Sequence, residues 1–361
     1  MAAELEKIET AIEASQKSVV SREKEVGEDA ERPRGPAGLD IGTSHIIMAQ
    51  NKGKQINTVK QLNAFFTIPT SQFTKKILKE NEVNFFEKND QFYILGYSAQ
   101  NFANMFNTNT RRTMEKGLLS VKEDDGITVL QALINTLIAK NKRNGETICF
   151  SVPGEPLGGS NAVVYHESIL KMYLTRLGYK PISINEGLAT IMAELANDNF
   201  TGIGISMGGG MCNICLSYLS VPIITYSIQR GGDYIDNMVG FSVGEPATKV
   251  KTIKEEGLDL SVNPKNRVET ALHIYYDDLL QYLLKSLAEV LHTSDKVPKI
   301  GEPIPIVLSG GTVMPNGFRQ KFEANLTKVK LPVNISEIRF AVDPLNTTAK
   351  GAMVMALSEV M

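Results

Sequence analysis

The chain has 361 residues, of which 42% are hydrophobic and 22% charged, and its formal net charge is −2. This length and composition are typical of a globular protein with room for two domains, and they exclude a disordered chain. A charge so close to zero gives no electrostatic reason to expect nucleic acid as the main ligand. No apolar run reaches the roughly 18 residues that span a bilayer, and the charged N-terminus lacks the apolar core of a signal peptide, so we expect a cytoplasmic protein.

The first 34 residues form a separate segment, rich in Glu, Lys and Ala. Its apolar positions fit a spacing of three and four residues: Leu5, Ile8, Ile12, Val19 and Val26. This spacing favours a coiled-coil helix that binds a protein partner, but Ser15 and Arg22 interrupt the seam, so a solvated, partly disordered tail is an equal alternative. No broad apolar face exists for direct membrane insertion. Prolines and glycine then make a linker that ends the extension at residue 36.

The first half of the chain reads as strands, an insertion, and then alternating helix and strand. Three consecutive antiparallel strands are predicted at 38–41, 46–50 and 55–59. Residues 60–115 are mixed and predict an inserted subdomain with a strand at 92–95 and a helix at 98–105. Later elements are a helix at 127–138, a buried strand at 147–152 and a helix at about 159–177, which Gly178 and Pro181 end.

The second half repeats this plan. Strands are predicted at 202–206, 214–220 and 223–229, followed by a helix that opens at Gly231. Residues 246–300 are mostly helical, including 268–291, and a short buried strand follows at 304–308. The chain ends in an apolar helix. The two halves therefore repeat the same order of strands and helices without repeating the amino-acid sequence.

Each half begins with a glycine-rich turn between two strands. The two turns are Gly38-Leu-Asp-Ile-Gly-Thr-Ser-His45 and Gly204-Ile-Ser-Met-Gly-Gly-Gly-Met-Cys-Asn213. Glycine-rich turns present backbone N–H groups at close range without a Cβ in the way, and short hydroxyl side chains complete a cage for phosphate. The sequence therefore predicts one phosphate-binding hairpin, used twice.

The three cysteines, Cys149, Cys212 and Cys215, lie in apolar surroundings and are expected to be reduced, buried thiols. Cys212 and Cys215 have the spacing of a redox or zinc motif. They fall within one predicted strand, however, where residues three apart point to opposite faces. The four histidines also lack metal-ligand spacing.

Short segments that match in order carry a family resemblance. Besides the first turn they are Met114-Glu-Lys-Gly-Leu-Leu119, Ser151-Val-Pro153, Asn185-Glu-Gly187, Gly208-Gly-Gly210, Gly231-Gly-Asp233, Val307-Leu-Ser-Gly-Gly-Thr312, Pro344-Leu345 and Ala349-Lys-Gly-Ala352. Over residues 37–358 the chain resembles the actin, heat-shock chaperone and sugar-kinase superfamily, and within it the bacterial actins related to MreB and MamK.

The resemblance implies an actin-like ATPase fold of the α/β class. Two duplicated ribonuclease-H-like domains, each on a five-stranded sheet, would hold a nucleotide in the cleft between them. Domain I would comprise 37–182 and 341–361, with a small subdomain at about 60–110. Domain II would comprise 183–340, with a small helical subdomain at about 246–300, and residues 1–36 would form the N-terminal helical extension and linker.

The resemblance also implies a site for ATP or ADP with Mg²⁺. Glu186 and Asp40 would be the catalytic residues: Glu186 would orient the attacking water, and Asp40 would hold the metal through water. The other nucleotide contacts would come from Gly42, Thr43, Ser44, Ser206, Gly208, Gly209, Gly210, Gly232, Asp233, Lys251, Lys254, Gly310, Gly311 and Thr312.

The same residues also allow other interpretations. Asp40 could cap a turn, although an acid in an apolar strand needs a strong partner, which favours the metal role. Glu186 could serve only as an acid at a helix start. Lys251 and Lys254 could form a solvated helix face, and the glycines of the adenosine loop could make an ordinary turn.

One position departs from the family pattern. Where the second phosphate turn usually carries Asp, this chain has Ser206, and the two hydroxyl residues that usually end the turn are missing. Serine cannot supply the charge that helps to hold a divalent ion, whereas the glycine backbone still binds phosphate. We therefore expect slow or absent hydrolysis.

The leading functional hypothesis is a cytoskeletal protein that binds ATP and polymerises with itself into filaments that position or organise a cellular structure. A nucleotide-binding adaptor that does not polymerise is the main alternative. A small-molecule kinase is less favoured, because no Asp lies near Gly187 to act as the base for a sugar hydroxyl.

Overall fold

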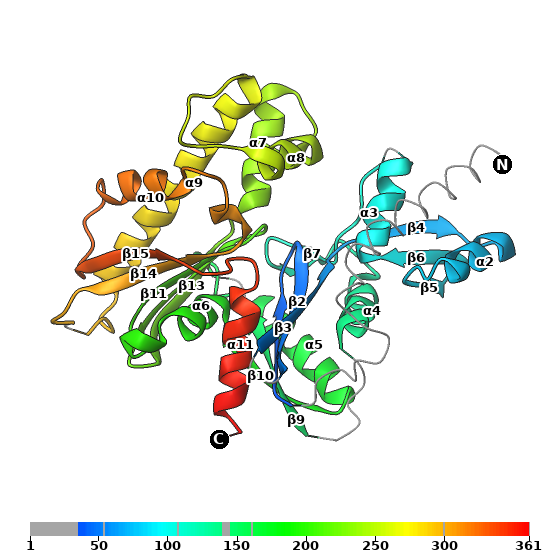
Figure 1. Cartoon of the computed structure of the whole chain (residues 1–361), viewed down its shortest axis with the longest axis horizontal. Coiled ribbons are helices and arrows are strands. Elements are labelled where there is room, and N and C mark those ends of the chain that lie inside the picture. The colour runs from blue at the N-terminus through cyan, green and yellow to red at the C-terminus, as the bar shows by residue number, and fades with distance from the viewer. Residues whose placement is uncertain are drawn as a thin grey trace.

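The computed structural model describes residues 35–52, 55–106, 108–138, 145–159, 162–298 and 300–360. The predicted helix within residues 1–34 lies outside the described residues. Two five-stranded sheets form the two halves of the protein, and helices α6 (Glu186–Glu194) and α11 (Thr347–Ser358) lie between them (Figure 1). The α/β class and the pair of five-stranded sheets predicted from the sequence are confirmed.

The first sheet has the strand order β10-β9-β1-β2-β3. Its strands are β1 (Ala37–Ile41), β2 (His45–Lys52), β3 (Gln55–Leu62), β9 (Glu146–Val152) and β10 (Tyr179–Asn185). The three predicted antiparallel strands pair as expected, and β9 and β10 join them in parallel. The sequence does not predict strand β10, because Pro181 also marks the end of the preceding helix. Proline is tolerated there because β10 is an edge strand.

The two faces of the first sheet pack against different helices. On one face Leu39 and Ile46 pack against α4 (Gly126–Leu137) and α5 (Ala162–Arg176). On the other face Ile47 and Ala49 pack against Ala349 and Met353 of α11. Neighbouring side chains of β2 point to opposite faces of the sheet, as the two-residue period of a strand requires. The second face is the one that turns toward the other half of the protein.

The insertion predicted at 60–115 forms a small separate layer on the right of Figure 1. Its three-stranded sheet has the order β4-β6-β5, and its own apolar core contains Phe92 and Phe102. The elements are β4 (Phe65–Pro69), α2 (Gln72–Glu80), β5 (Phe85–Lys88), β6 (Gln91–Leu95) and α3 (Gly96–Met105). The chain returns through a short hairpin of β7 (Met114–Glu115) and β8 (Leu118–Leu119).

The second sheet has the order β13-β12-β11-β14-β15 and repeats the topology of the first. Its strands are β11 (Gly202–Met207), β12 (Cys212–Tyr218), β13 (Val221–Ile228), β14 (Ile304–Ser309) and β15 (Ile335–Phe340). The sequence does not predict helix α10 (Phe318–Leu326), which is polar along most of its length, or strand β15, whose apolar residues Ile335, Ile338 and Phe340 do not alternate regularly with polar ones. They pack at the outer edge of the sheet, where only part of each element is buried.

Three helices follow the second set of antiparallel strands. They are α7 (Gly232–Val243), α8 (Ala247–Gly257) and the long α9 (Arg267–Thr293), close to the positions that the sequence predicts. The leucines of α9 pack into the core of the second sheet. Within the part of the chain that the structure describes, no helix is long and apolar enough to cross a membrane.

The three cysteines are free and buried, as predicted. Cys212 packs into the core of the second sheet, whereas Cys215 packs into the cluster around α6 on the opposite face. Burial raises the pKa of the Cys149 and Cys215 thiols to about 12. These thiols are therefore protonated at neutral pH and unsuited to bind a metal.

Glycines allow α6, α11 and the central strands to approach one another closely. A Cβ on Gly351 of α11 would lie 1.8 Å from the carbonyl oxygen of Ala189 in α6, and one on Gly204 would lie 2.2 Å from that of Gly187. In the same way, a Cβ on Gly38 would lie 2.1 Å from the carbonyl oxygen of Ala349. The two halves of the protein are thus joined through a contact that only glycine permits.

Candidate nucleotide-binding cleft

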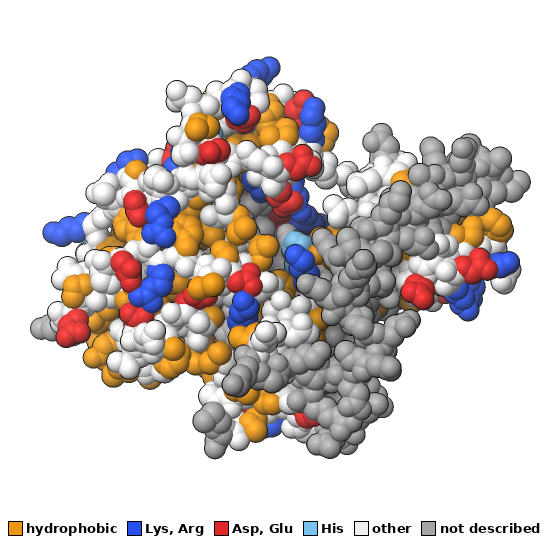
Figure 2. All heavy atoms as spheres, in the orientation of Figure 1, with side chains coloured by type: hydrophobic (Ala, Val, Ile, Leu, Met, Phe, Trp, Pro, Cys, Tyr) orange, Lys and Arg blue, Asp and Glu red, His pale blue; other side chains and the backbone are white. Residues whose placement is uncertain are grey.

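A cavity of about 530 Å³ lies between the two sheets. In the space-filling view the surface is hollowed here, and charged side chains and a histidine are visible inside (Figure 2). Every site residue predicted from the sequence lines this cavity: Asp40, Gly42, Thr43, Ser44, Glu186, Ser206, Gly208, Gly209, Gly210, Gly232, Asp233, Lys251, Lys254, Gly310, Gly311 and Thr312. Segments more than 250 residues apart in the sequence therefore converge, and the roles assigned to them stay predictions.

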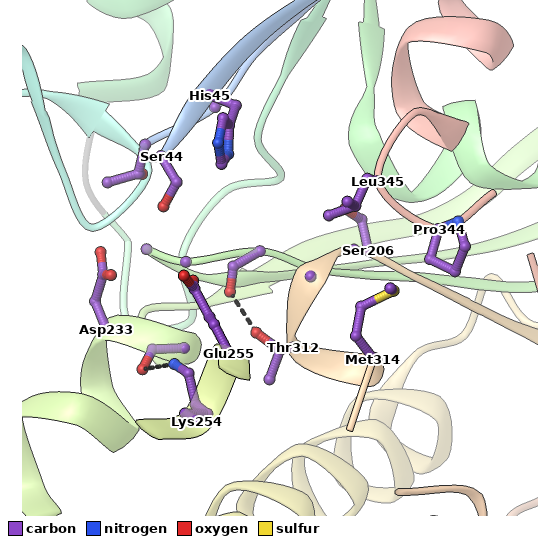
Figure 3. A pocket seen from close by; sticks show the side chains of 18 of the residues that line it. Ser44, His45, Ser206, Asp233, Lys254, Glu255, Thr312, Met314, Pro344 and Leu345 are labelled. Carbon is purple, nitrogen blue, oxygen red and sulfur yellow. Dashed lines mark hydrogen bonds between the residues drawn. The ribbon is translucent and has the colours of Figure 1, made fainter. Parts of the chain in front are cut away.

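The first glycine turn connects β1 to β2. The N–H of Gly42 donates to the carbonyl of His45 over 2.9 Å, which closes the turn. The hydroxyl of Thr43 accepts a 3.0 Å hydrogen bond from the N–H of Gly117 in the β7–β8 hairpin. Ser44 points toward the cavity beside His45 (Figure 3). The turn is therefore fixed by its own backbone and by the hairpin.

The second glycine turn faces the first across the cleft. A Cβ on Gly209 would lie 2.5 Å from the Ser44 hydroxyl, and one on Gly210 would lie 2.4 Å from the Thr43 hydroxyl. The carbonyl of Gly208 accepts hydrogen bonds from the N–H of Gly232 and from the Thr312 hydroxyl, at 3.0 and 2.9 Å. Any larger residue would fill the space between the turns, which is the requirement of a backbone cradle for phosphate.

Two half-buried carboxyl groups lie at the base of the cradle. Asp40, on β1, accepts a 2.8 Å hydrogen bond from the Ser151 hydroxyl, and its pKa is raised to about 6 because burial penalises the charged form. Glu186 is the first residue of α6, and burial, together with the nearby Asp40 charge, raises its pKa to about 8. Asp40 does not cap the turn, since the Gly42 N–H bonds elsewhere.

Ser206, where the family resemblance leads us to expect Asp, is hydrogen-bonded to Glu186. Its hydroxyl donates to Glu186 Oε2 over 3.3 Å, and the Asn213 side-chain amide donates to the same oxygen over 2.9 Å. Both bonds favour the charged form of Glu186, but burial outweighs them. Glu186 thus both begins a helix and lines the cavity, and its catalytic role stays a prediction.

Asn213 and Ser151 are site residues that sequence reasoning missed. Asn213 is fully buried, and its carbonyl oxygen accepts a 2.8 Å hydrogen bond from the N–H of Gly154. Gly154 belongs to the segment after β9, which runs beside Ser227 at the edge of the second sheet. The sequence signal was present, because Asn213 is an amide within an apolar strand and Ser151 precedes a Val-Pro turn.

The acids fit a magnesium ion in part. Two carboxyl groups share the base of the cradle, and among the described residues no positively charged side chain shifts the pKa of either one. Mg²⁺ commonly uses one or two carboxylates and fills its remaining positions with water and phosphate oxygens. Among the described residues no group of three or more His, Cys, Asp or Glu side chains forms a complete metal site.

The opposite end of the cavity is built by α8 and the loop after β14. Lys254 of α8 reaches α7, where it donates to the Asp236 carboxylate over 2.8 Å and to the Gly232 carbonyl over 3.1 Å (Figure 3). Lys251 pairs with Glu255 at 3.7 Å. Neither lysine is a freely solvated side chain. Gly310 takes a left-handed φ of 94°, and a Cβ there would lie 2.2 Å from the Met207 carbonyl oxygen.

One ion pair crosses the mouth of the cleft. The Arg112 guanidinium, just before β7 in the first half, lies 2.9 Å from the carboxylate of Asp233 in the first turn of α7. Both side chains are about 30% exposed. The cleft is therefore closed over the two turns by a contact between residues 121 positions apart.

A family comparison agrees with this architecture. The volactin family model matches residues 36–356. The chain belongs to the volactin family. No curated protein matches the chain. The match covers both glycine turns and the whole cleft but begins after the N-terminal extension.

Solved structures with the same fold include bacterial actins. The MamK double helical filament has 17% sequence identity and a TM-score of 0.65, covering 89% of this chain and 98% of that chain. MreB5 of Spiroplasma citri bound to AMPPNP has 13% identity and a TM-score of 0.65, covering 91% and 98%. The ethanolamine utilization protein EutJ of Carboxydothermus hydrogenoformans has 16% identity and a TM-score of 0.51, covering 90% and 91%. The predicted actin-like fold is confirmed.

Proposed function

We propose that this volactin-family protein binds an adenine nucleotide with Mg²⁺ in the cleft and polymerises into filaments in the cytoplasm. The observation that carries the proposal is the pair of glycine turns facing each other across one cavity, with two half-buried carboxyl groups beneath them. The MreB5 neighbour was solved with AMPPNP, and the MamK neighbour as a double helical filament. Both support the proposal.

Different residues along the cavity bind different parts of the nucleotide. The backbones of the two turns, with Thr43 and Ser44, hold the terminal phosphates, and Asp40 holds the metal shell. The loop at Gly310–Thr312 and the α8 lysines face the adenosine. A bound Mg²⁺ supplies positive charge that neutralises the phosphates. Because the cavity lies between two halves, its occupancy bears on the angle between them.

Hydrolysis is expected to be slow for two reasons. Ser206 cannot add the negative charge that helps to place a metal ion. In addition, burial raises the pKa of Glu186, which favours its protonated form and makes it a poorer acceptor for a proton from water. A bound nucleoside triphosphate would therefore be hydrolysed slowly.

Replacing Ser206 with Asp should accelerate phosphate release from Mg–ATP by about tenfold, the lower end of the effect of a side chain that orients a metal ion. The Ser206→Ala variant is the matched control and should keep the wild-type rate. A steady-state phosphate assay measures the three rates. A wild-type rate equal to that of Ser206→Asp would contradict the idea that this position limits hydrolysis.

Assembly is tested by sedimentation and negative-stain microscopy of the full chain with and without ATP. We expect polymer in the pellet and filaments on the grid only with nucleotide. A monodisperse monomer at high concentration with ATP would exclude the filament hypothesis and leave the nucleotide-binding adaptor. Removal of residues 1–34 then tests whether the extension recruits a partner, since assembly should survive its loss.

A further inference from the structure

A row of three side chains crosses the first sheet at the cleft. Asp40 on β1 is paired with Ile47 on β2, and Ile47 is paired with Lys60 on β3. Directly paired residues of neighbouring antiparallel strands point to the same face of the sheet. The three residues also all line the cavity. Lys60 therefore faces the same space as Asp40, roughly 10 Å away across two strand spacings.

Ile47 lies between the two charged residues, and it favours a Lys60 side chain that extends over it toward the cavity. It is only 4% exposed and packs against α11 in the apolar cluster with Ala49 and Ala349. The apolar stem of a lysine packs well over such a neighbour while its ammonium stays in the solvent-filled cavity. Lys60 itself is exposed, so its ammonium is free to turn toward a ligand.

Lys60 differs from the other two lysines of the cavity in its ion pairing. In the part of the chain that the structure describes, six carboxyl groups line the cavity but only three lysines do: Lys60, Lys251 and Lys254. Lys254 is engaged by Asp236, and Lys251 lies 3.7 Å from Glu255. Among the described residues Lys60 has no ion-pair or hydrogen-bond partner, which makes it the cavity lysine whose full charge is available.

We propose that Lys60 is a phosphate-binding residue of this cleft, whose ammonium pairs with the phosphate oxygens of a nucleoside triphosphate. The inference rests on the proposed nucleotide binding and goes beyond it by naming a residue outside both glycine turns and outside every sequence motif. A polyphosphate brought beside two carboxyl groups needs a cation, and a lysine ammonium serves as a point charge for phosphate. Strand β3 thereby takes part in the site.

The test compares the binding of ATP, AMP and adenosine to the full chain by calorimetry. Lys60→Met keeps the apolar stem and removes the charge. It should weaken ATP binding about tenfold, in line with the worth of one charge-assisted hydrogen bond, and change adenosine binding less than about twofold. Lys60→Arg should keep ATP binding near the wild-type level. The matched control is Lys180→Met, an exposed lysine on the opposite edge strand of the same sheet.

The outcomes separate this inference from the function on which it rests. A wild-type protein that binds none of the three probes contradicts the proposed function, and the role of Lys60 falls with it. Wild-type binding of ATP with an unchanged Lys60→Met affinity overturns the role of Lys60 alone. An equal loss for ATP and adenosine also overturns it, because a phosphate contact cannot affect a ligand that has no phosphate.

Discussion

The Gly351→Ala variant is expected to lose at least about 2 kcal/mol of unfolding free energy. The added Cβ would meet the carbonyl oxygen of Ala189 at 1.8 Å and its carbonyl carbon at 2.5 Å. Both atoms belong to the backbone of α6, so no side chain can turn away to relieve the overlap. The helices would have to separate, and the cluster that joins the two sheets would lose contact. Urea unfolding followed by circular dichroism measures the change.

Gly257→Ala is the matched control for this prediction. Gly257 is also a helical glycine, the last residue of α8, but a Cβ there has no heavy atom within 4 Å. Alanine is the better helix former by up to about 1 kcal/mol, so this variant should be neutral or slightly more stable. Equal stabilities for the two variants would show that α6 and α11 are not as closely packed as the structure has them.

The unliganded protein is expected to lose stability as the pH rises from 6 to 8. The folded-state pKa of Glu186 is raised from 4.5 to about 8, so between these values the folded chain binds one proton more than the unfolded chain. Stability then falls with rising pH by up to about 1.4 kcal/mol per pH unit, or about 2 kcal/mol over this window. Asp40, with its pKa of about 6, adds a smaller loss near the acid end.

Glu186→Gln should remove most of this pH dependence. Glutamine keeps an oxygen that can accept from Ser206 and Asn213 but does not titrate. Thermal unfolding at several pH values, with a chelator and without nucleotide, gives the comparison. Glu80→Gln is the control, since Glu80 lies exposed on α2 and its loss should leave the wild-type slope unchanged. A Glu186→Gln profile as steep as that of the wild type would refute the assignment.

The sequence predicts most of the fold, because apolar periodicity and turn glycines mark the elements that build the core. The elements it misses share a reason. Strand β10 contains Pro181, α10 is largely polar, and the apolar residues of β15 lack a regular alternation, so none shows the pattern of a buried element. Each lies at an edge, where neighbours from distant parts of the chain decide the conformation rather than local propensity.

For the cleft, the sequence could indicate which residues gather but not how they pair. Motif order brings Asp40, Glu186 and Ser206 together, yet the buried bond from Asn213 to Glu186 depends on the register of β11 and β12. The position of Lys60 depends on the register of β2 and β3 in the same way. A pairing register is set by the whole sheet, so neither contact has a local sequence signature.

Asn213 connects three parts of the molecule through one side chain. Its amide nitrogen donates to Glu186 in the helix between the sheets, and its oxygen accepts from Gly154 in the segment that leaves the first sheet. Asn213 itself is carried by β12 of the second sheet. Gly154 belongs to the first half, whereas Asn213 and Glu186 both fall in the range expected for the second, so a change in the angle between the halves would strain the Gly154 bond and, through it, the Asn213 side chain. We therefore expect the orientation of the Glu186 carboxyl to depend on how far the cleft is open.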